Sequence, residues 1–284
     1  MLKQCILSLI IVLVAFFTRE IESAVARLKG VSYDISKVKN DEMVDRDFKA
    51  MKQYGFDLVR LYEWKDHVSL ADLALKNGLQ IIFSINLQNI EQGCAIVNSK
   101  GAAFNTICMG NENMQDRSLT IPIMGSHIDA VKKCLNQNMK YLKLALCERM
   151  TEFIQIDLSP LQPKVDYMLA SIHPFFSSEV LTSAAADLKL ELDSVHNKYG
   201  ALQVGLSETG YTTSGQPAVK NPPSLDMMCK LFTYYKQLAA ENPGQAPYVY
   251  FMFKDVDYKS TEAENSFGLQ YLNGTDKCPV CTVP

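Results

Sequence analysis

The sequence predicts an α/β fold built as a single (β/α)8 TIM barrel. Eight apolar, strand-like runs alternate with amphipathic, helix-like segments along the chain. The runs are almost continuously hydrophobic, as expected for strands of a parallel sheet whose two faces are both covered. The 284-residue chain is 48% hydrophobic, which is enough apolar content for one sizeable core. No linker, repeat or low-complexity tract divides it, so we expect one domain.

Residues 1–26 are predicted to be a cleaved signal peptide, which leaves residues 27–284 as the folded domain. Lys3 supplies a positive charge, an apolar run extends from Cys5 to Phe17, and Ala24-Val25-Ala26 resembles a cleavage site. A signal anchor is the alternative, but this apolar run is short for a membrane span. No later stretch of the sequence is long and apolar enough to cross a membrane. We therefore expect a secreted, extracellular protein with no membrane contact after the signal is removed.

The predicted strands cover, in order, residues 28–34, 56–63, 79–86, 104–112, 140–147, 165–176, 201–208 and 247–255. Between them, apolar residues recur at helical spacing in 43–51, 70–74, 128–135, 180–199 and 225–240. Residues 113–126 are expected to form a loop broken by a proline, with the next helix starting only near His127. An open doubly wound sheet is the alternative fold, but it usually carries a glycine-rich phosphate turn, and Gly30 stands alone.

The cysteine content indicates disulfides, which a secreted protein can form. Seven cysteines remain once Cys5 is removed with the signal: Cys94, Cys108, Cys134, Cys147, Cys229, Cys278 and Cys281. Because seven is odd, at least one thiol is free or pairs between chains. Cys278-Pro279-Val280-Cys281 could suggest zinc, but there is no second such motif and the four histidines are scattered. A structural disulfide, either local or to another cysteine, is favoured for Cys278. Asn273-Gly274-Thr275 is an N-glycosylation sequon.

Composition and motifs exclude several classes of function. The formal net charge of −3 offers no basic stripe, so a nucleic-acid partner is not expected. Gly205-Leu206-Ser207-Glu208-Thr209 lacks the last glycine of the serine-hydrolase elbow. No zinc-protease, phosphate-loop or calcium-loop motif is present in the sequence. We expect no metal and no cofactor.

In a (β/α)8 barrel the active site lies at the carboxyl ends of the strands. Polar and aromatic residues close the predicted strands: Tyr33, Asp34, Tyr62, Glu63, Asn86, Asn111, Glu112, Glu148, His173, Glu208, Lys254 and Asp255. Glu112 ends the fourth strand and Glu208 the seventh, on opposite sides of the barrel mouth, so we expect their carboxyls to converge. Two carboxyls held across one cleft are the minimum equipment for cutting a glycosidic bond.

The two glutamates need different surroundings for that chemistry. A general acid must keep its proton near working pH, whereas a nucleophilic carboxylate must stay ionised and hydrogen-bonded. Asn111 suits a hydrogen bond to the sugar 2-hydroxyl, and Tyr211 is expected to donate to the Glu208 carboxylate. Aromatic residues at the strand ends can stack on sugar faces: Tyr33, Tyr62, Phe175, Phe176 and Tyr211.

Each of these assignments has a simpler alternative. Glu112 could be a solvated loop carboxylate, Glu208 a charge that caps a turn, and His173 a core histidine. Their positions at strand ends favour catalysis for the glutamates and sugar contact for His173. For Asp255 and Lys259, a surface ion pair and a role in substrate binding are equally supported.

Short segments around these residues together resemble glycoside hydrolase family 17, the secreted β-1,3-glucanases and glucanosyltransferases, most of all the fungal cell-wall members. They come in the family's order and cover nearly the whole mature chain: Gly30-Val31-Ser32-Tyr33, Val59-Arg60-Leu61-Tyr62, Gly110-Asn111-Glu112, Ser171-Ile172-His173-Pro174-Phe175-Phe176, Glu208-Thr209-Gly210-Tyr211, Tyr250-Phe251-Met252-Phe253-Lys254-Asp255 and Glu264-Asn265-Ser266-Phe267-Gly268-Leu269.

The resemblance implies Glu112 as acid/base and Glu208 as nucleophile. It also implies that Asn111, Tyr33, His173, Phe175 and Tyr211 surround the sugar. The chain departs from the family at three positions. Tyr211 stands where a tryptophan is usual, and Met252 and Val256 stand where members often carry glutamates.

The interpretation is therefore a secreted, monomeric hydrolase that cleaves β-1,3-glucan with retention, located outside the cell or at the cell wall. A transglycosylase is the first alternative, since it shares both glutamates and differs only in the acceptor. A non-catalytic glucan-binding protein on the same barrel is the second, and loss of either glutamate would have favoured it. The β-1,3 linkage rests on the family resemblance alone.

Overall fold

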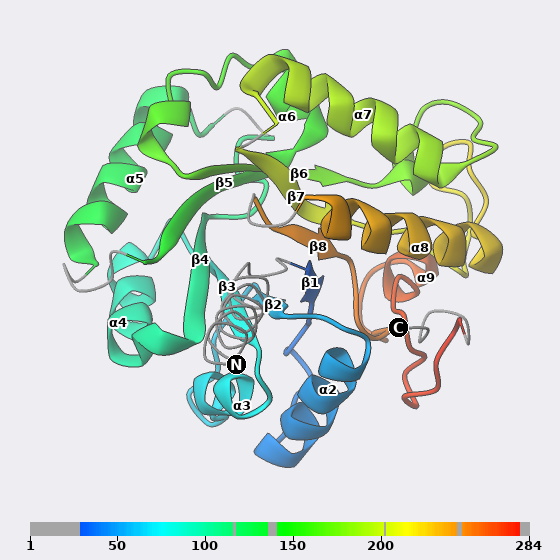
Figure 1. Ribbon diagram of the computed structural model, residues 1–284, viewed down its shortest axis with the longest axis horizontal. Helices are drawn as coiled ribbons and strands as arrows, with labels where there is room; N and C mark the ends of the chain where they lie inside the picture. The colour runs from blue at the N-terminus through cyan, green and yellow to red at the C-terminus, as the bar shows by residue number, and fades with distance from the viewer. Residues whose placement is uncertain (1–28, 116–117, 136–140, 202, 243–245, 279–284) are drawn as a thin grey trace, which may run out of the picture.

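The computed structural model describes residues 29–115, 118–135, 141–201, 203–242 and 246–278. The predicted signal peptide, residues 1–26, lies outside the described residues. The described part forms a closed barrel in which eight parallel strands follow one another in sequence order, with helices around the outside (Figure 1). The strands are β1 (Lys29–Ser32), β2 (Leu58–Leu61), β3 (Gln80–Ile85), β4 (Phe104–Met109), β5 (Lys143–Arg149), β6 (Tyr167–Ile172), β7 (Val204–Thr209) and β8 (Tyr248–Tyr250). The predicted (β/α)8 fold is confirmed.

Strand β8 is much shorter than the predicted run 247–255. Beyond Tyr250 the backbone hydrogen bonds divide between two partners. The Phe251 and Phe253 N–H groups still donate to the last carbonyls of β7 and β1, at 2.7 and 3.0 Å, whereas the Met252 N–H donates to the Phe267 carbonyl at 3.2 Å and the Asp255 N–H to the Gln270 carbonyl at 2.9 Å. The apolar run therefore lies between the barrel and the C-terminal segment and pairs with both, so its hydrophobicity reflects a second buried contact and not a longer regular strand.

The helices are α2 (Asp41–Gln53), α3 (Leu70–Lys76), α4 (Ile90–Lys100), α5 (Ile121–Cys134), α6 (Met150–Gln155), α7 (Ala184–Tyr199), α8 (Leu225–Glu241) and α9 (Glu262–Asn265), with short 3-10 turns η1 (Gly101–Ala103), η3 (Gln162–Lys164) and η4 (Pro174–Phe176). The predicted start of α5 near His127 was wrong. The helix begins at Ile121, because Pro122 lies in its first turn, where a backbone N–H has no partner to lose. Helices α4 and α6 were not anticipated.

The apolar residues divide into two clusters. A small one fills the inside of the barrel: Leu58, Ile82, Cys108, Ala145, Cys147, Leu169, Ala246 and Val249. A much larger one lies between the strands and the surrounding helices. Side chains alternate along a strand, so the residue two positions after a member of the inner cluster also faces into the barrel. These positions lie nearer the carboxyl ends of the strands and border the barrel mouth. Arg60, Ser84 and Ser171 occupy such positions, each two residues beyond a member of the inner cluster.

Three disulfides join elements that are distant in sequence. Cys94–Cys134 links α4 to α5, Cys108–Cys147 links β4 to β5 inside the barrel, and Cys229–Cys278 links α8 to the C-terminal segment. The predicted structural disulfide of Cys278 is confirmed, and its partner is Cys229, not the local Cys281. Cys281 itself lies outside the described residues. Asn273 of the sequon is exposed in a tight turn. Among the described residues, no helix is long and apolar enough to cross a membrane, and no group of histidine, cysteine and acidic side chains could hold a metal.

Candidate active site

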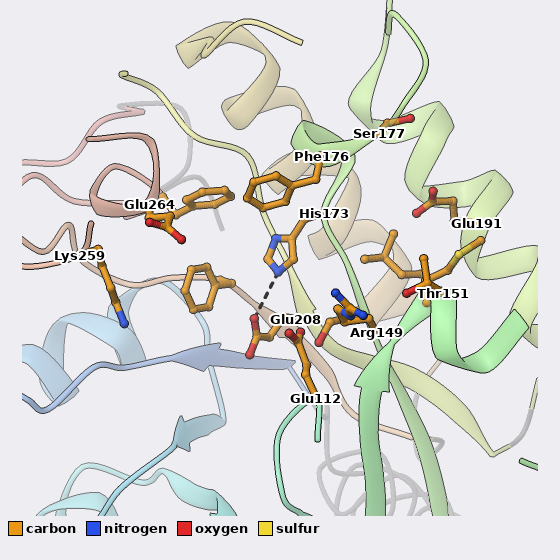
Figure 2. Close-up of a pocket in the computed structure, with 15 residues that line it drawn as sticks. Glu112, Arg149, Thr151, His173, Phe176, Ser177, Glu191, Glu208, Lys259 and Glu264 are labelled. Atoms are coloured by element: carbon orange, nitrogen blue, oxygen red, sulfur yellow. Dashed lines mark hydrogen bonds and ion pairs between the residues drawn. The ribbon is translucent and has the colours of Figure 1, made fainter. Parts of the chain in front are cut away.

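The carboxyl ends of the strands enclose a cavity of about 560 Å³, and both predicted glutamates line it. In Figure 2, Glu112 and Glu208 lie next to each other at its centre, with His173 above Glu208. A second hollow, of about 460 Å³, shares Glu208, Phe251 and Lys259 with the first. The two hollows therefore adjoin at Glu208, and the barrel mouth is open on both sides of this residue.

Glu208 is held as an ionised carboxylate. Its strand, β7, is buried over its whole length, and only 6% of Glu208 is exposed. Oε1 accepts hydrogen bonds from the Arg60 guanidinium at 3.0 Å and the Tyr62 hydroxyl at 2.8 Å, and Oε2 lies 3.2 Å from His173 Nε2. Burial by itself would raise the pKa of Glu208, but the His173 hydrogen bond and the Arg60 charge outweigh it and lower the pKa below its ordinary value.

Arg60 is the residue that sequence reasoning missed. It is completely buried in β2, and it also donates to the Ser207 carbonyl and to Asn111 Oδ1, both at 2.7 Å. Its signal was present in the sequence, because an arginine inside an otherwise apolar strand is almost never buried without a charged partner. Arg60 therefore identifies the barrel interior as a place that must hold a carboxylate.

Tyr62 supports Glu208 as a neutral donor. Its hydroxyl contacts Ser32 Oγ at 2.7 Å as well as Glu208 Oε1. Burial, and next the negative charge of Glu208, raise the pKa of the Tyr62 hydroxyl well above its ordinary value. The phenol thus keeps its proton at neutral pH and can donate a hydrogen bond to the carboxylate.

Glu112 has the opposite environment. It lies beyond the end of β4 in a left-handed backbone conformation with φ of 53°, and its N–H donates to the Cys147 carbonyl at 2.9 Å. No cation is paired with its carboxyl among the described residues. Burial, and next the charge of Glu208, raise its pKa, although a hydrogen bond from Ser171 partly opposes them. Glu112 is therefore suited to hold a proton under conditions in which Glu208 has lost its own.

A sequence profile of the BtgE/BtgC glycoside hydrolase domain matches residues 30–268, which is most of the chain. The chain belongs to the BtgE/BtgC glycoside hydrolase family. Among curated protein sequences, none matches it significantly.

Solved structures with the same fold are remote in sequence. An endo-laminarinase from Formosa Hel1_33_131 is 16% identical with a TM-score of 0.72, and the alignment covers 88% of this chain and 85% of that one. A glycoside hydrolase family 17 β-1,3-glucanosyltransferase from Rhizomucor miehei is 18% identical with a TM-score of 0.73, covering 89% and 96%. CJP38, a β-1,3-glucanase and allergen of Cryptomeria japonica pollen, is 15% identical with a TM-score of 0.65, covering 89% and 98%.

Four other predicted site residues of this BtgE/BtgC domain lie at the mouth. His173 lines the main cavity, Tyr62 and Asn111 line the second hollow, and Lys259 borders both. Asn111 points its Oδ1 at Arg60, which leaves its side-chain NH2 group as the donor available to a sugar.

Tyr211 and Phe175 are placed away from the cavity. The Tyr211 hydroxyl donates to the Pro222 carbonyl at 3.0 Å and its ring is buried against Phe175. The expected hydrogen bond from Tyr211 to Glu208 was therefore wrong, and Tyr62 makes it instead. Phe175 is fully buried, whereas the next residue, Phe176, is 46% exposed and lines the cavity. Both phenylalanines belong to the 3-10 turn η4, in which successive side chains point about a third of a turn apart.

Tyr33 borders the second hollow but is only 3% exposed, and its hydroxyl donates to Asp47 at 2.8 Å, so it has little surface on which a sugar could stack. The possible surface pair of Asp255 and Lys259 does not form. Asp255 accepts from Lys277 at 2.8 Å, whereas Lys259 Nζ lies 3.6 Å from Asp34. Asp255 lines neither hollow.

The cavity also has lining residues that the sequence analysis did not single out: Arg149, Met150, Thr151, Ser171, Ile172, Ser177, Glu191, Phe251, Glu264 and Phe267. Most come from β5, β6 and the segments that follow them. Glu191 comes from the middle of α7, where no strand-end rule could have identified it.

Proposed function

We propose that this glycoside hydrolase domain is a secreted, retaining β-1,3-glucanase of the family 17 type, with Glu208 as nucleophile and Glu112 as acid/base. The observation that carries the proposal is the opposite behaviour of two carboxyls that face each other across one cavity. Burial and Glu208 raise the pKa of Glu112, whereas hydrogen bonds and the Arg60 charge lower that of Glu208 despite its burial. Such a division is the arrangement by which one carboxyl acts as acid and the other as nucleophile.

In the first step a Glu208 oxygen bonds to the anomeric carbon while the bond from that carbon to the glycosidic oxygen breaks. Glu112 transfers its proton to the departing oxygen. Arg60, Tyr62 and His173 keep the attacking carboxylate ionised and correctly oriented. Asn111 precedes Glu112 in the chain and accepts from the same guanidinium as Glu208, and it supplies a hydrogen bond to the sugar 2-hydroxyl, which strengthens in the transition state.

In the second step Glu112, now a carboxylate, takes a proton from a water molecule. The water oxygen bonds to the anomeric carbon and the bond to Glu208 breaks, which restores both carboxyls. Because two displacements occur at one carbon, the β configuration is retained. Retention requires the two carboxyls to be about 5–5.5 Å apart, and this is the separation that the proposal expects for Glu112 and Glu208.

The choice of β-1,3-glucan as substrate is supported by the family 17 motifs and by the fold shared with an endo-laminarinase and a β-1,3-glucanosyltransferase. Adjoining hollows on both sides of Glu208 suit an internal bond of a chain, since sugar units can lie on either side of the cleavage point.

Transfer to a second glucan chain is the alternative activity that one feature favours. Phe176 is 46% exposed and stacks on Phe267, with ring centroids 6.1 Å apart and an angle of 25° between the rings. Both rings line the cavity that contains Glu112, and such a platform could hold a sugar acceptor in place of water.

Secretion is supported by the predicted signal peptide, by the three disulfides and by the exposed sequon at Asn273. On this proposal residues 27–284 are the mature catalytic domain, which acts as a monomer on wall or dietary glucan.

The test measures reducing-sugar release from laminarin and follows the anomeric protons of the first product by NMR. The wild-type protein should release β-configured ends, and Glu112→Gln and Glu208→Gln should each lose most turnover. Glu42→Gln, an exposed carboxyl on α2, is the control and should behave as wild type. Near-normal activity in both site variants would overturn the assignment, and products longer than the starting oligosaccharide would indicate transfer.

A further inference from the structure

A third glutamate, Glu148, lies beside the site and has no part in the mechanism above. We propose that Glu148 is a positioning residue that holds the turn carrying Glu112, so that the proton of the general acid points at the glycosidic oxygen. The inference rests on the proposed role of Glu112 as acid/base.

The turn that carries Glu112 is unusual in its backbone. Gly110 has φ of 73°, and a Cβ at this position would lie 1.9 Å from the Asn113 side chain. Glu112 has φ of 53° although it is not a glycine, and it is the one such residue in the described part of the chain. A side-chain-bearing residue in this region costs on the order of 1–3 kcal/mol and persists only where its surroundings hold it.

Strand β5 provides those surroundings. The Glu112 N–H donates to the Cys147 carbonyl at 2.9 Å, and the Met114 N–H donates to Glu148 Oε2 at 3.1 Å. The catalytic residue is thus bracketed by two hydrogen bonds to consecutive residues of β5. The Cys108–Cys147 disulfide joins the same two strands just below. Of these contacts, the one from Glu148 is the only side-chain hydrogen bond, so it can be removed by substitution without altering the strand backbone.

Glu148 can accept a hydrogen bond without adding a negative charge to the site. It is completely buried, and its Oε1 has no hydrogen-bond partner among the described residues. Burial, and after it the charges of Glu152 and Glu112, raise its pKa to about 8. The nearby cation, Arg149, is paired with Glu152 at 2.6 Å. A neutral carboxyl at this place can hold the Met114 N–H without placing a second negative charge beside the general acid.

If the role of Glu148 were purely structural, its loss would lower stability and slow all chemical steps alike. Asp166 offers a matched comparison at the opposite end of β5. Its carboxylate accepts the Leu144 N–H at 2.9 Å, so it anchors the same strand but lies far from the barrel mouth. Loss of either carboxyl should lower the melting temperature, whereas only loss of Glu148 should impair protonation of the leaving group.

The experiment compares two substrates that differ in their need for an acid. A laminari-oligosaccharide leaves as an alcohol and needs the proton of Glu112, whereas 2,4-dinitrophenyl β-laminaribioside leaves as a stable phenolate and does not. The ratio of the two kcat/KM values therefore reports on the position of Glu112 and is insensitive to general loss of folded protein.

For Glu148→Leu we expect kcat/KM on the oligosaccharide to fall about 100-fold, because a small misplacement of a catalytic group has an effect of this size. On the dinitrophenyl glycoside, kcat/KM should fall by about 3-fold or less. Glu148→Gln keeps an acceptor oxygen and should stay within about 3-fold on both substrates. Asp166→Leu should leave the ratio of the two rates unchanged. If Glu148→Leu does not fold, Glu148→Asp, which withdraws the carboxyl by one methylene, should change the ratio about 10-fold.

An unchanged ratio in Glu148→Leu or Glu148→Asp would overturn the inference, and so would equal damage in Glu148→Gln and Glu148→Leu. Failure of the proposed function gives a different result. In that case the wild-type protein itself would not hydrolyse laminarin. It would also form no covalent adduct on Glu208 with 2,4-dinitrophenyl 2-deoxy-2-fluoro-β-laminaribioside. If the wild-type protein forms the adduct and the ratio does not change, only the role of Glu148 is refuted.

Discussion

Glu208 and Glu112 stand at the ends of β7 and β4, and the protein supports them by different means. Glu208 is part of a strand and is surrounded by charged and polar side chains from other strands: Arg60, Tyr62 and His173. Glu112 lies outside its strand in a left-handed turn, with backbone contacts to β5 and no cation paired with it in the part of the chain that the structure describes.

This difference shows how one fold gives two identical side chains opposite chemistry. Glu208 is buried and Glu112 is partly buried, and burial alone would raise the pKa of both. The cation and the hydrogen-bond donors reverse this effect at Glu208, whereas the charge of Glu208 adds to it at Glu112. A strand position therefore supports the proposed nucleophile, and a constrained turn supports the proposed acid.

The largest expected effect separates the two roles directly. Glu208→Gln removes the nucleophile, so both laminarin and 2,4-dinitrophenyl β-laminaribioside should be essentially unreacted. Glu112→Gln should lose about 10²–10⁴-fold on laminarin, as removal of a general acid does, but should still form the glycosyl-enzyme rapidly from the activated substrate. Rapid mixing with detection of the dinitrophenolate burst measures this. If both variants lose the burst alike, the comparison between the two carboxyls fails.

The next effect concerns the buried ion pair. Arg60→Met should lower the free energy of unfolding by about 3–5 kcal/mol, because it leaves Glu208 buried without its cation. It should also raise the pKa of Glu208, so the acid limb of kcat/KM against pH moves upward. Urea denaturation and the pH profile check these results. Arg46→Met, at a side chain that is 69% exposed, is the control and should change stability by no more than about 0.5 kcal/mol.

A third prediction concerns stability against pH at Glu148. Its pKa is raised to about 8 in the folded state, and an unfolded glutamate titrates near 4.3. The folded state therefore binds the extra proton, and this contribution to stability is complete below the unfolded pKa and is lost as pH rises through about 8. Glu148→Gln cannot titrate at this position. The melting temperature of the wild type should therefore fall relative to that of Glu148→Gln as the pH rises from about 5 to about 8. A constant gap across this range would mean that Glu148 is ionised in the folded protein.

The smallest effect distinguishes two tyrosines. Tyr62→Phe removes one hydrogen bond to the Glu208 carboxylate, which at about 1.5 kcal/mol corresponds to roughly 10-fold in kcat. Tyr211→Phe removes a hydroxyl that bonds the Pro222 carbonyl instead, so turnover should stay within about 2-fold. Steady-state kinetics on laminari-oligosaccharides check both. The reverse order would restore Tyr211 as the donor to Glu208.

The barrel itself could be predicted from the sequence because buried parallel strands impose an unmistakable pattern. The runs that became β2, β3, β4 and β7 were each identified within a few residues. Prediction failed where another contact replaced the expected one. The run after Tyr250 is apolar because it pairs with residues 267–270, and α5 starts early because Pro122 fits a first turn.

Within the site, prediction succeeded for residues whose position on a strand determines their direction. Glu208, near the end of β7, and His173, directly after β6, line the cavity for that reason. It failed for Tyr211 and Phe175, which lie beyond the strand ends, where the alternation of a strand no longer sets the direction of a side chain. The importance of Arg60 could have been inferred from the rarity of a buried arginine.

By itself the sequence determined that eight strands alternate with helices and that two glutamates lie at or just beyond the carboxyl ends of the fourth and seventh strands, since periodicity and strand order are local properties of the chain. Only the tertiary structure decided which groups surround each glutamate. Arg60 and Tyr62 lie about 150 residues before Glu208, and Glu148 lies on a different strand from Glu112. The pKa of a buried carboxyl depends on charges and donors within a few ångströms in space, and closure of the barrel is what brings them there.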